Sequence, residues 1–256
     1  MSESFQPISH YSKNKILNKI LFLSRLLLDF QFKTLYFNLK KELSKVEGNV
    51  IDVGCGDSPY KHLLGGNAIY TGLDYNQSSE FNYKRTDVIY FDGNKFPFAN
   101  ESFDFVLCTE VLEHIPEPYK FIDEVYRILK FGGKALITVP WSARYHYIPN
   151  DYFRYTPTTL HKLFCNFKEV IIKTRGTDLT AICSKSIVFY AGLVSNILKR
   201  EKSSFKFIYK FIINSIFVII LLPLCLAIVV LGHISLLLNI GSSDDCLGYT
   251  VLITKS

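Results

Sequence analysis

Short runs of β-branched and aromatic residues alternate with helical stretches between residues 49 and 175, and this alternation limits the possible folds more than any other feature. Helical stretches are predicted at 117–130 and 158–164, and Gly132-Gly133 is predicted to end the first of them before the next strand. The pattern predicts an α/β, Rossmann-like, doubly wound and mostly parallel sheet with helices on both faces. The predicted strands are 49–53, 69–74, 85–89, 103–108, 134–140 and 167–174, with a last strand at 246–254.

The turn after the first predicted strand carries the strongest sign of a ligand site. An apolar run ends at Asp52, and Gly54-Cys55-Gly56 follows at once. Glycines allow a tight turn and close approach of the backbone to a ligand. Ser58 is predicted to cap a helix whose first residue is Pro59.

Further polar residues follow the other predicted strands. Asp74 ends the second strand, eighteen residues after Gly56, where an acid can accept both ribose hydroxyls of an adenosine. Asp92 precedes the strand 103–108, and Thr109 and Glu110 follow it directly. Because open α/β sheets bind ligands at the carboxyl ends of their strands, these residues are predicted to share one site.

Together these motifs resemble the class I S-adenosylmethionine-dependent methyltransferases, in the branch that includes the ubiquinone-biosynthesis-type enzymes. The resemblance covers about residues 48–140 and implies S-adenosylmethionine as the cofactor. It also implies a last strand that runs antiparallel between two others, which 248–254 fits. Ser58 departs from the family, which often has a third glycine there. The matching segments are 52–56, Asp74, 96–98, 102–104, 111–114 and 124–133.

The resemblance implies a role for each cofactor residue. Asp52 and the turn Gly54, Cys55 and Gly56 would surround the methionine part. Asp74, with Tyr75 beside it, would hold the ribose, and Asp92 would accept from the adenine amine. The methyl-donor pocket would be lined by Thr109 and Glu110.

Residues 140–155 form a segment dense in aromatic side chains with ionisable groups among them, beyond a predicted strand end. It resembles a loop of bacterial methyltransferases associated with surface-polysaccharide gene clusters. We predict the acceptor site here, with His146 as the first candidate base and Asp151 as the second. Arg154 and Arg144 would hold a phosphate or carboxylate of the acceptor. The alternative is a loop that only packs helices.

No metal site is predicted. The six cysteines include no Cys-x-x-Cys pair and no Cys/His group at metal-ligand spacing, which indicates buried thiols in a reducing compartment. Glu113-His114 lacks a second histidine at helical spacing. Asp104, Glu124 and Arg127 are interpreted as structural residues.

Basic charge gathers beside apolar stretches, which fits anionic lipid better than nucleic acid. Residues 1–45 hold eight basic and three acidic residues, residues 185–210 hold six and one, and the remainder is net acidic. Residues 12–45 predict one helix or two, either a lid on the catalytic domain or an amphipathic helix on the membrane. No signal-peptide cleavage site is recognised.

The thirty-one residues 211–241 contain no Asp, Glu, Lys or Arg. We expect them to form a re-entrant or interfacial hairpin that breaks at Pro223, with halves 207–222 and 224–240. The alternatives are one transmembrane helix with 242–256 on the far side, and a soluble helical subdomain or oligomer interface. The predicted units are the basic helices 1–46, a methyltransferase domain formed by 47–184 and 246–256, and the membrane-associated insertion 185–245. The basic residues just before the apolar run predict a cytoplasmic catalytic domain. They are Lys199, Arg200, Lys202, Lys206 and Lys210.

The predicted function is methyl transfer from S-adenosylmethionine, on oxygen, to a lipid-linked sugar or another small molecule. Two alternatives stay open. A nicotinamide-dependent oxidoreductase or epimerase would need Gly-x-Gly-x-x-Gly, but Pro59 stands at the sixth position. A membrane scaffold with a degenerate cofactor fold would not need the intact set of Asp52, Asp74 and Asp92.

Overall fold

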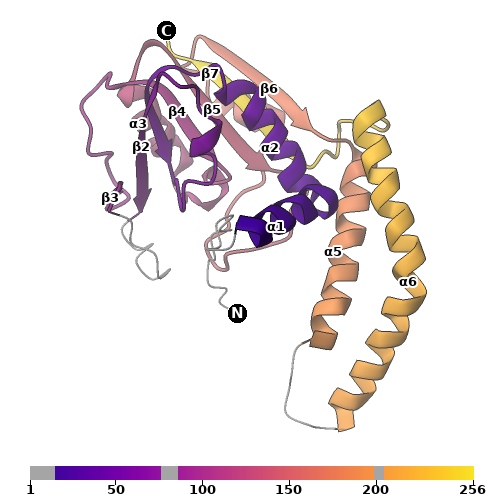
Figure 1. Cartoon of the computed structure of the whole chain (residues 1–256). Coiled ribbons are helices and arrows are strands. Elements are labelled where there is room, and N and C mark those ends of the chain that lie inside the picture. Colours follow the sequence, from indigo (N-terminus) through magenta and orange to yellow (C-terminus); the bar gives the residue numbers. More distant parts are fainter. Residues whose placement is uncertain (1–14, 76–85, 199–204) are drawn as a thin grey trace.

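One seven-stranded sheet organises the chain, in the strand order β3-β2-β1-β4-β5-β7-β6 (Figure 1). The computed structural model describes residues 15–75, 86–198 and 205–256. β1 to β5 pair in parallel, whereas β7 runs antiparallel to both neighbours. The predicted fold class is confirmed, including the last strand between two others. The strands are β1 (Gly48–Val53), β2 (Ala68–Tyr75), β3 (Val88–Phe91), β4 (Phe103–Thr109), β5 (Leu129–Pro140), β6 (Glu169–Arg175) and β7 (Gly248–Thr254).

Helices cover both faces of this sheet because its central strands are apolar on both sides, as buried parallel strands usually are. On one face, α3 (Pro118–Ile128) and α4 (Pro157–Leu163) pack against side chains such as Ile51 and Val106. On the other face, α2 (Phe30–Leu43) packs Leu39 and Leu43 against Val50 and its neighbours. The successive residues Val50 and Ile51 therefore belong to opposite cores, as the pleat of a strand requires.

The N-terminal segment forms two helices, α1 (Lys15–Leu28) and α2. The break falls at Asp29, whose carboxylate accepts a hydrogen bond from the Phe32 amide at 2.9 Å and caps α2. α1 packs Phe22 and Leu26 on the domain, but much of its apolar surface is exposed. The exposed apolar residues of α1 are Ile16, Leu17, Ile20, Leu21, Leu23, Leu27 and Leu28.

Two local predictions are wrong. No α-helix begins at Pro59, and the chain instead forms turns and the short 3-10 helix η1 (Lys61–Leu63). Ser58 adopts a left-handed φ of +53°, which favours glycine and does not start a helix, and its hydroxyl accepts from Tyr70. Likewise α3 ends at Ile128 and β5 begins at Leu129, so Gly132 lies inside the strand segment, with a φ of +73°.

A long antiparallel pair of helices, α5 (Asp178–Leu198) and α6 (Phe205–Leu238), extends away from the sheet (Figure 1). The predicted break at Pro223 is wrong, because α6 continues through it. A proline removes one hydrogen bond, and in apolar surroundings a helix that keeps the others is favoured over exposed backbone. The connection between the helices falls instead at residues 199–204, outside the described residues, together with Lys199, Arg200 and Lys202.

The end of this hairpin nearest the sheet is packed, and the rest is exposed. Thr177, Thr180 and Ser235 exchange hydroxyl hydrogen bonds of 2.9–3.2 Å at its base. Beside them, Phe30 of α2 packs against Val229. Farther along, large apolar residues such as Ile219 and Ile220 are about two-thirds exposed. Both helices are long and apolar enough to cross a membrane, by length and composition.

Candidate active site

The predicted cofactor residues gather at one edge of the sheet, where the parallel strands end. Asp52 lies near the end of β1, Asp74 near the end of β2, and Thr109 at the end of β4. Because β2, β1 and β4 are neighbours in the sheet, these positions lie side by side. This is the edge at which open α/β sheets bind ligands.

The glycine turn is held by backbone geometry and by Asp74. Gly54 and Gly56 adopt left-handed φ values of +71° and +51°. A side chain on Gly54 would collide with Val111, in the segment after β4, so the two loops approach closely. Asp74 accepts hydrogen bonds from the Gly56 amide at 3.1 Å and the Tyr75 amide at 2.8 Å. The structure therefore links the ends of β1 and β2 through the acid predicted to hold the ribose.

Asp52 is a buried carboxylate with unused hydrogen-bonding capacity. Its side chain is only 1% exposed, and one oxygen accepts from the Tyr70 hydroxyl at 2.9 Å. The other oxygen has no hydrogen-bond partner within the described part of the chain. Burial raises the pKa of Asp52 to about 7. The structure thus holds a carboxyl group that changes charge near neutral pH beside the glycine turn.

The remaining predicted cofactor residues lie around these two. Asp92, directly after β3, is exposed and accepts from the amide and side chain of Asn94, which lowers its pKa. Tyr75 is 41% exposed, and its ring packs against Phe91. Glu110 has a left-handed φ of +53° and accepts a 2.8 Å hydrogen bond from Arg175. Cys55 is buried within the glycine turn.

Asp151 organises the predicted acceptor loop. Its side chain is 1% exposed, and both oxygens accept from the Arg154 guanidinium, at 2.6 and 2.8 Å. It also accepts from the backbone amide of His146 at 3.1 Å. The hydrogen bonds from Arg154 and His146 outweigh burial and lower the pKa of Asp151. The Arg154 guanidinium, which is predicted to bind the acceptor, therefore donates its hydrogen bonds to Asp151 in this structure. The roles of both residues toward an acceptor stay predictions.

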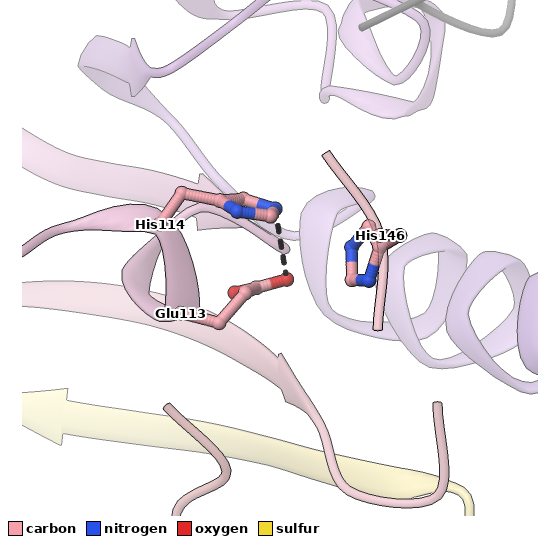
Figure 2. Close-up of side chains that lie close together, drawn as sticks. All are labelled: Glu113, His114 and His146. Carbon is pink, nitrogen blue, oxygen red and sulfur yellow. Dashed lines mark ion pairs between the residues drawn. The ribbon is translucent and has the colours of Figure 1, made fainter. Parts of the chain in front are cut away.

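The acceptor loop contacts the segment after β4 through the short 3-10 helix η3 (Leu112–His114). The Tyr152 amide donates to the Glu113 carbonyl at 2.8 Å, and the Tyr155 hydroxyl donates to the Leu112 carbonyl at 3.0 Å. The His114 and His146 rings lie edge to face, with centroids 5.0 Å apart. Figure 2 shows the side chains of Glu113 and His114 directed toward His146.

Sequence reasoning misses four residues of this region. Tyr70 bonds Asp52, and the fully buried Arg175 bonds Glu110. Glu113 and His114 lack a second histidine at helical spacing, but His146 supplies one from thirty-two positions further along the chain. The sequence does offer a sign of Arg175. It directly follows the predicted strand 167–174, and a cation at the carboxyl end of a strand lies at the edge of the sheet that binds ligands.

The sheet order, the glycine turn after β1 and the acid at the end of β2 define the class I methyltransferase fold. Residues 51–137 match the sequence model of the family described as "Methyltransferase domain". A solved S-adenosylmethionine-dependent methyltransferase from Archaeoglobus fulgidus superposes with a TM-score of 0.51 at 16% identity, over 92% of this chain and 99% of that one. Residues 51–137 are therefore similar to a methyltransferase domain, and the sheet has the fold of the solved S-adenosylmethionine-dependent methyltransferase.

Curated relatives match just under half of the chain. An uncharacterised protein of Methanocaldococcus jannaschii is 34% identical over 111 residues, which are 42% of this chain and 48% of that protein. The demethylmenaquinone methyltransferase of Listeria monocytogenes is 28% identical over 138 residues, 47% of this chain and 58% of that enzyme. The chain thus spans about half the length of the curated relatives it matches.

A larger enzyme shares the fold. Phosphoethanolamine N-methyltransferase 2 of Haemonchus contortus, solved with S-adenosyl-L-methionine, superposes with a TM-score of 0.52 at 17% identity, over 96% of this chain and 60% of that one. At this identity the likeness shows the fold alone.

Proposed function

We propose that this protein transfers the methyl group of S-adenosylmethionine to an oxygen of a membrane-held acceptor, such as a lipid-linked sugar. One observation carries the proposal. The cofactor residues lie at the same edge of the sheet from which the apolar hairpin departs, because β6 ends at Arg175 just before α5 and β7 begins at Gly248 after α6. The reacting groups would therefore lie close to the membrane surface.

The cofactor would bind across the ends of β1, β2 and β4. The amides of the glycine turn and the Asp52 carboxyl would surround its methionine part, and Asp74 would accept from the ribose hydroxyls. This assignment is supported by the left-handed turn at Gly54 and Gly56 and by the placement of Asp74 beside it. It also agrees with the Archaeoglobus protein, described as dependent on S-adenosylmethionine, and with the Haemonchus enzyme, solved in complex with it.

Methyl transfer asks little covalent chemistry of the protein, since the sulfonium of the cofactor is already a strong electrophile. The protein mainly holds donor and acceptor in line, and it assists loss of the hydroxyl proton. We assign that second task to His146. Its Nδ1 lies 2.9 Å from the Arg144 carbonyl, which can only accept, so the neutral ring carries its lone pair on Nε2. The side chain is 30% exposed, so it is open to an incoming acceptor.

Membrane association is supported by the exposed apolar surface of the hairpin and of α1. On α6, side chains such as Ile219 and Leu226 are more than half exposed. On α1, Ile16 and Ile20 are also more than half exposed. Monomeric soluble proteins rarely expose so large an apolar surface, which marks an interaction with lipid or protein. We place α1 on the membrane surface, the second of the two interpretations left open by its sequence.

The hairpin is proposed to re-enter or lie in the cytoplasmic leaflet. Lys206 and Lys210 belong to the first turns of α6, at the end remote from the sheet (Figure 1). Two full crossings would carry these lysines to the outer side, against the preference of basic residues for the cytoplasm. Lys185 within α5 is also exposed, which disfavours a full crossing by that helix.

Isothermal titration of the purified chain tests the cofactor. S-adenosylhomocysteine should bind and NAD should not. Binding of NAD alone would support an oxidoreductase, and binding of neither would support a scaffold. Incubating the enzyme with labelled S-adenosylmethionine and membrane-lipid extracts should then place label in a lipid fraction. Label that appears only with water-soluble acceptors would contradict the lipid assignment.

Cysteine labelling in intact cells tests the topology. In a background in which the exposed Cys165 is replaced by Ser, a membrane-impermeant maleimide should label neither Lys206→Cys nor Ser256→Cys until the cells are permeabilised. Labelling of Lys206→Cys alone in intact cells would show two full crossings. Labelling of Ser256→Cys would contradict a cytoplasmic catalytic domain.

A further inference from the structure

A buried carboxylate without a partner lies beside the proposed acceptor site. The Glu113 side chain is fully buried, and neither of its oxygens has a hydrogen-bond partner among the residues that the structure describes. A buried, unsatisfied carboxylate is costly, so native proteins rarely keep one without an ion or a proton to compensate it. The His114 Nε2 lies 3.7 Å from a Glu113 oxygen, which is beyond hydrogen-bond distance.

Two histidine rings are oriented toward this carboxylate. The His114 Nδ1 lies 2.6 Å from the Asn150 carbonyl, and the His146 Nδ1 lies 2.9 Å from the Arg144 carbonyl. Carbonyl oxygens only accept, so each Nδ1 carries the proton and each neutral ring has its lone pair on Nε2. This is the arrangement of metal-binding histidines, whose other nitrogen donates to a carbonyl or a carboxylate. Asp151 adds the carboxylate, at 3.1 Å from the His146 Nδ1.

We propose that Glu113, His114 and His146 bind one divalent transition-metal ion, with Zn²⁺ as the best match to two imidazoles and a carboxylate. Ligand atoms of the three residues lie within 4.8 Å of one another (Figure 2). Ligands about 2.1 Å from a tetrahedral ion are about 3.4 Å apart, so the group needs to contract by roughly 1 Å. His146 comes from a loop and is partly exposed, so it is the ligand with most freedom to move.

This inference rests on the proposed function and specifies how the acceptor is activated. Three protein ligands leave an open position for the acceptor hydroxyl. Metal binding lowers the pKa of a bound hydroxyl, which releases its proton to solvent water. The alkoxide oxygen then forms a bond to the methyl carbon while the carbon–sulfur bond breaks, and its electron pair stays on sulfur in S-adenosylhomocysteine. His146 would act through the ion and would not itself take the proton.

Metal titration of the full chain tests the site. Tag-free protein in detergent is first freed of metal ions with a chelator. It is then titrated with Co²⁺, whose visible absorption reports its ligands, and the bound Co²⁺ is displaced with Zn²⁺. We expect one ion per chain. His114→Ala, His146→Ala and Glu113→Gln should each weaken binding by at least about 100-fold. Asp151→Asn, which changes the partner of the His146 Nδ1 and also weakens the pair with Arg154, should weaken binding by about 10–100-fold. His161→Ala is the matched control, because that histidine is exposed on α4.

S-adenosylhomocysteine affinity, measured on every variant, separates loss of the metal from loss of the fold. A variant that binds S-adenosylhomocysteine normally but no Co²⁺ supports the site. No saturable binding by the wild type, or equal binding by His146→Ala and the wild type, would overturn it. Full turnover of the chelated enzyme would overturn the role of the ion. Metal binding without S-adenosylhomocysteine binding would instead refute the proposed function and leave the metal site standing.

Discussion

The cofactor half and the acceptor half of the proposed site meet at one edge of the sheet but are assembled from different contacts. In the cofactor half, backbone amides and left-handed turns within a few residues of β1 and β2 place Asp52 and Asp74. In the acceptor half, the loop is held by side chains, chiefly the Asp151–Arg154 pair and the packing of His114 against His146. The two halves should therefore respond separately to mutation, with cofactor affinity changing in one and turnover or loop stability in the other.

The largest expected effect is on the cofactor half. Asp74→Ala removes the proposed acceptor of two ribose hydrogen bonds, each worth about 1.5–3 kcal/mol to a charged group. S-adenosylhomocysteine affinity, measured by calorimetry, should fall by about 100- to 10,000-fold. The control is Asp104→Asn, because Asp104 begins β4 at the opposite edge of the sheet and bonds Lys130. Unchanged affinity in the Asp74 variant would place the cofactor elsewhere.

His146→Ala should change the acceptor half alone. Assistance to proton removal contributes about 100- to 10,000-fold, so turnover should fall within that range. S-adenosylhomocysteine affinity should stay within about twofold, because the contacts of His146 are with Arg144, Asp151 and His114. Turnover is measured on the acceptor that the membrane-lipid extracts supply, with His161→Ala as the control variant. Normal turnover in the His146 variant would assign that residue a structural role.

Arg154→Ala should destabilise the acceptor loop without weakening cofactor binding. The substitution leaves the buried Asp151 carboxylate unpaired, which costs about 3–5 kcal/mol for a fully buried pair. Arg154 is 24% exposed, so solvent screening should reduce the loss to about 1–3 kcal/mol. Thermal denaturation measures it, and adding Asp151→Asn should recover part of the loss. If the double variant is less stable than the single one, the pair is not the main support of the loop.

The smallest expected effect is a pH dependence of cofactor binding. Burial raises the pKa of Asp52 to about 7, so its carboxylate forms only as the pH rises through that value. The methionine part of the cofactor carries an ammonium group, which the carboxylate attracts. S-adenosylhomocysteine affinity should therefore be about tenfold lower at pH 6 than on the plateau above pH 8. Asp52→Asn should flatten this profile, and a profile unchanged by that substitution would remove Asp52 from the site.

The difference between the halves also explains what the sequence could predict. The strands, the fold class and the positions of Asp52 and Asp74 follow from patterns within about 25 residues, where hydrophobic runs and glycines act locally. The left-handed Ser58 shows the limit of that reasoning, because one serine fits both a helix cap and a strained turn. Its actual partner, Tyr70, lies on the next strand.

Contacts between loops that are distant in the chain leave no recognisable pattern in the sequence, so they could not be predicted. The meeting of His114 with His146 depends on how the loop after β5 folds back over η3, which no residue spacing reports. Similarly, Pro223 predicts a break in the apolar run, but α6 continues through it. In both cases the local pattern does not report what the rest of the chain contributes.

The place of β7 also has a consequence for how the protein is made. β7 lies between β5 and β6, and β6 has no other strand partner in the described sheet. In chain order β7 follows the apolar hairpin, so during synthesis the hairpin leaves the ribosome while β6 is still unpaired. The sheet can therefore be completed only after the whole hairpin has been synthesised. Assembly of the sheet is thereby ordered in time, with synthesis of the apolar hairpin first and pairing of β6 second.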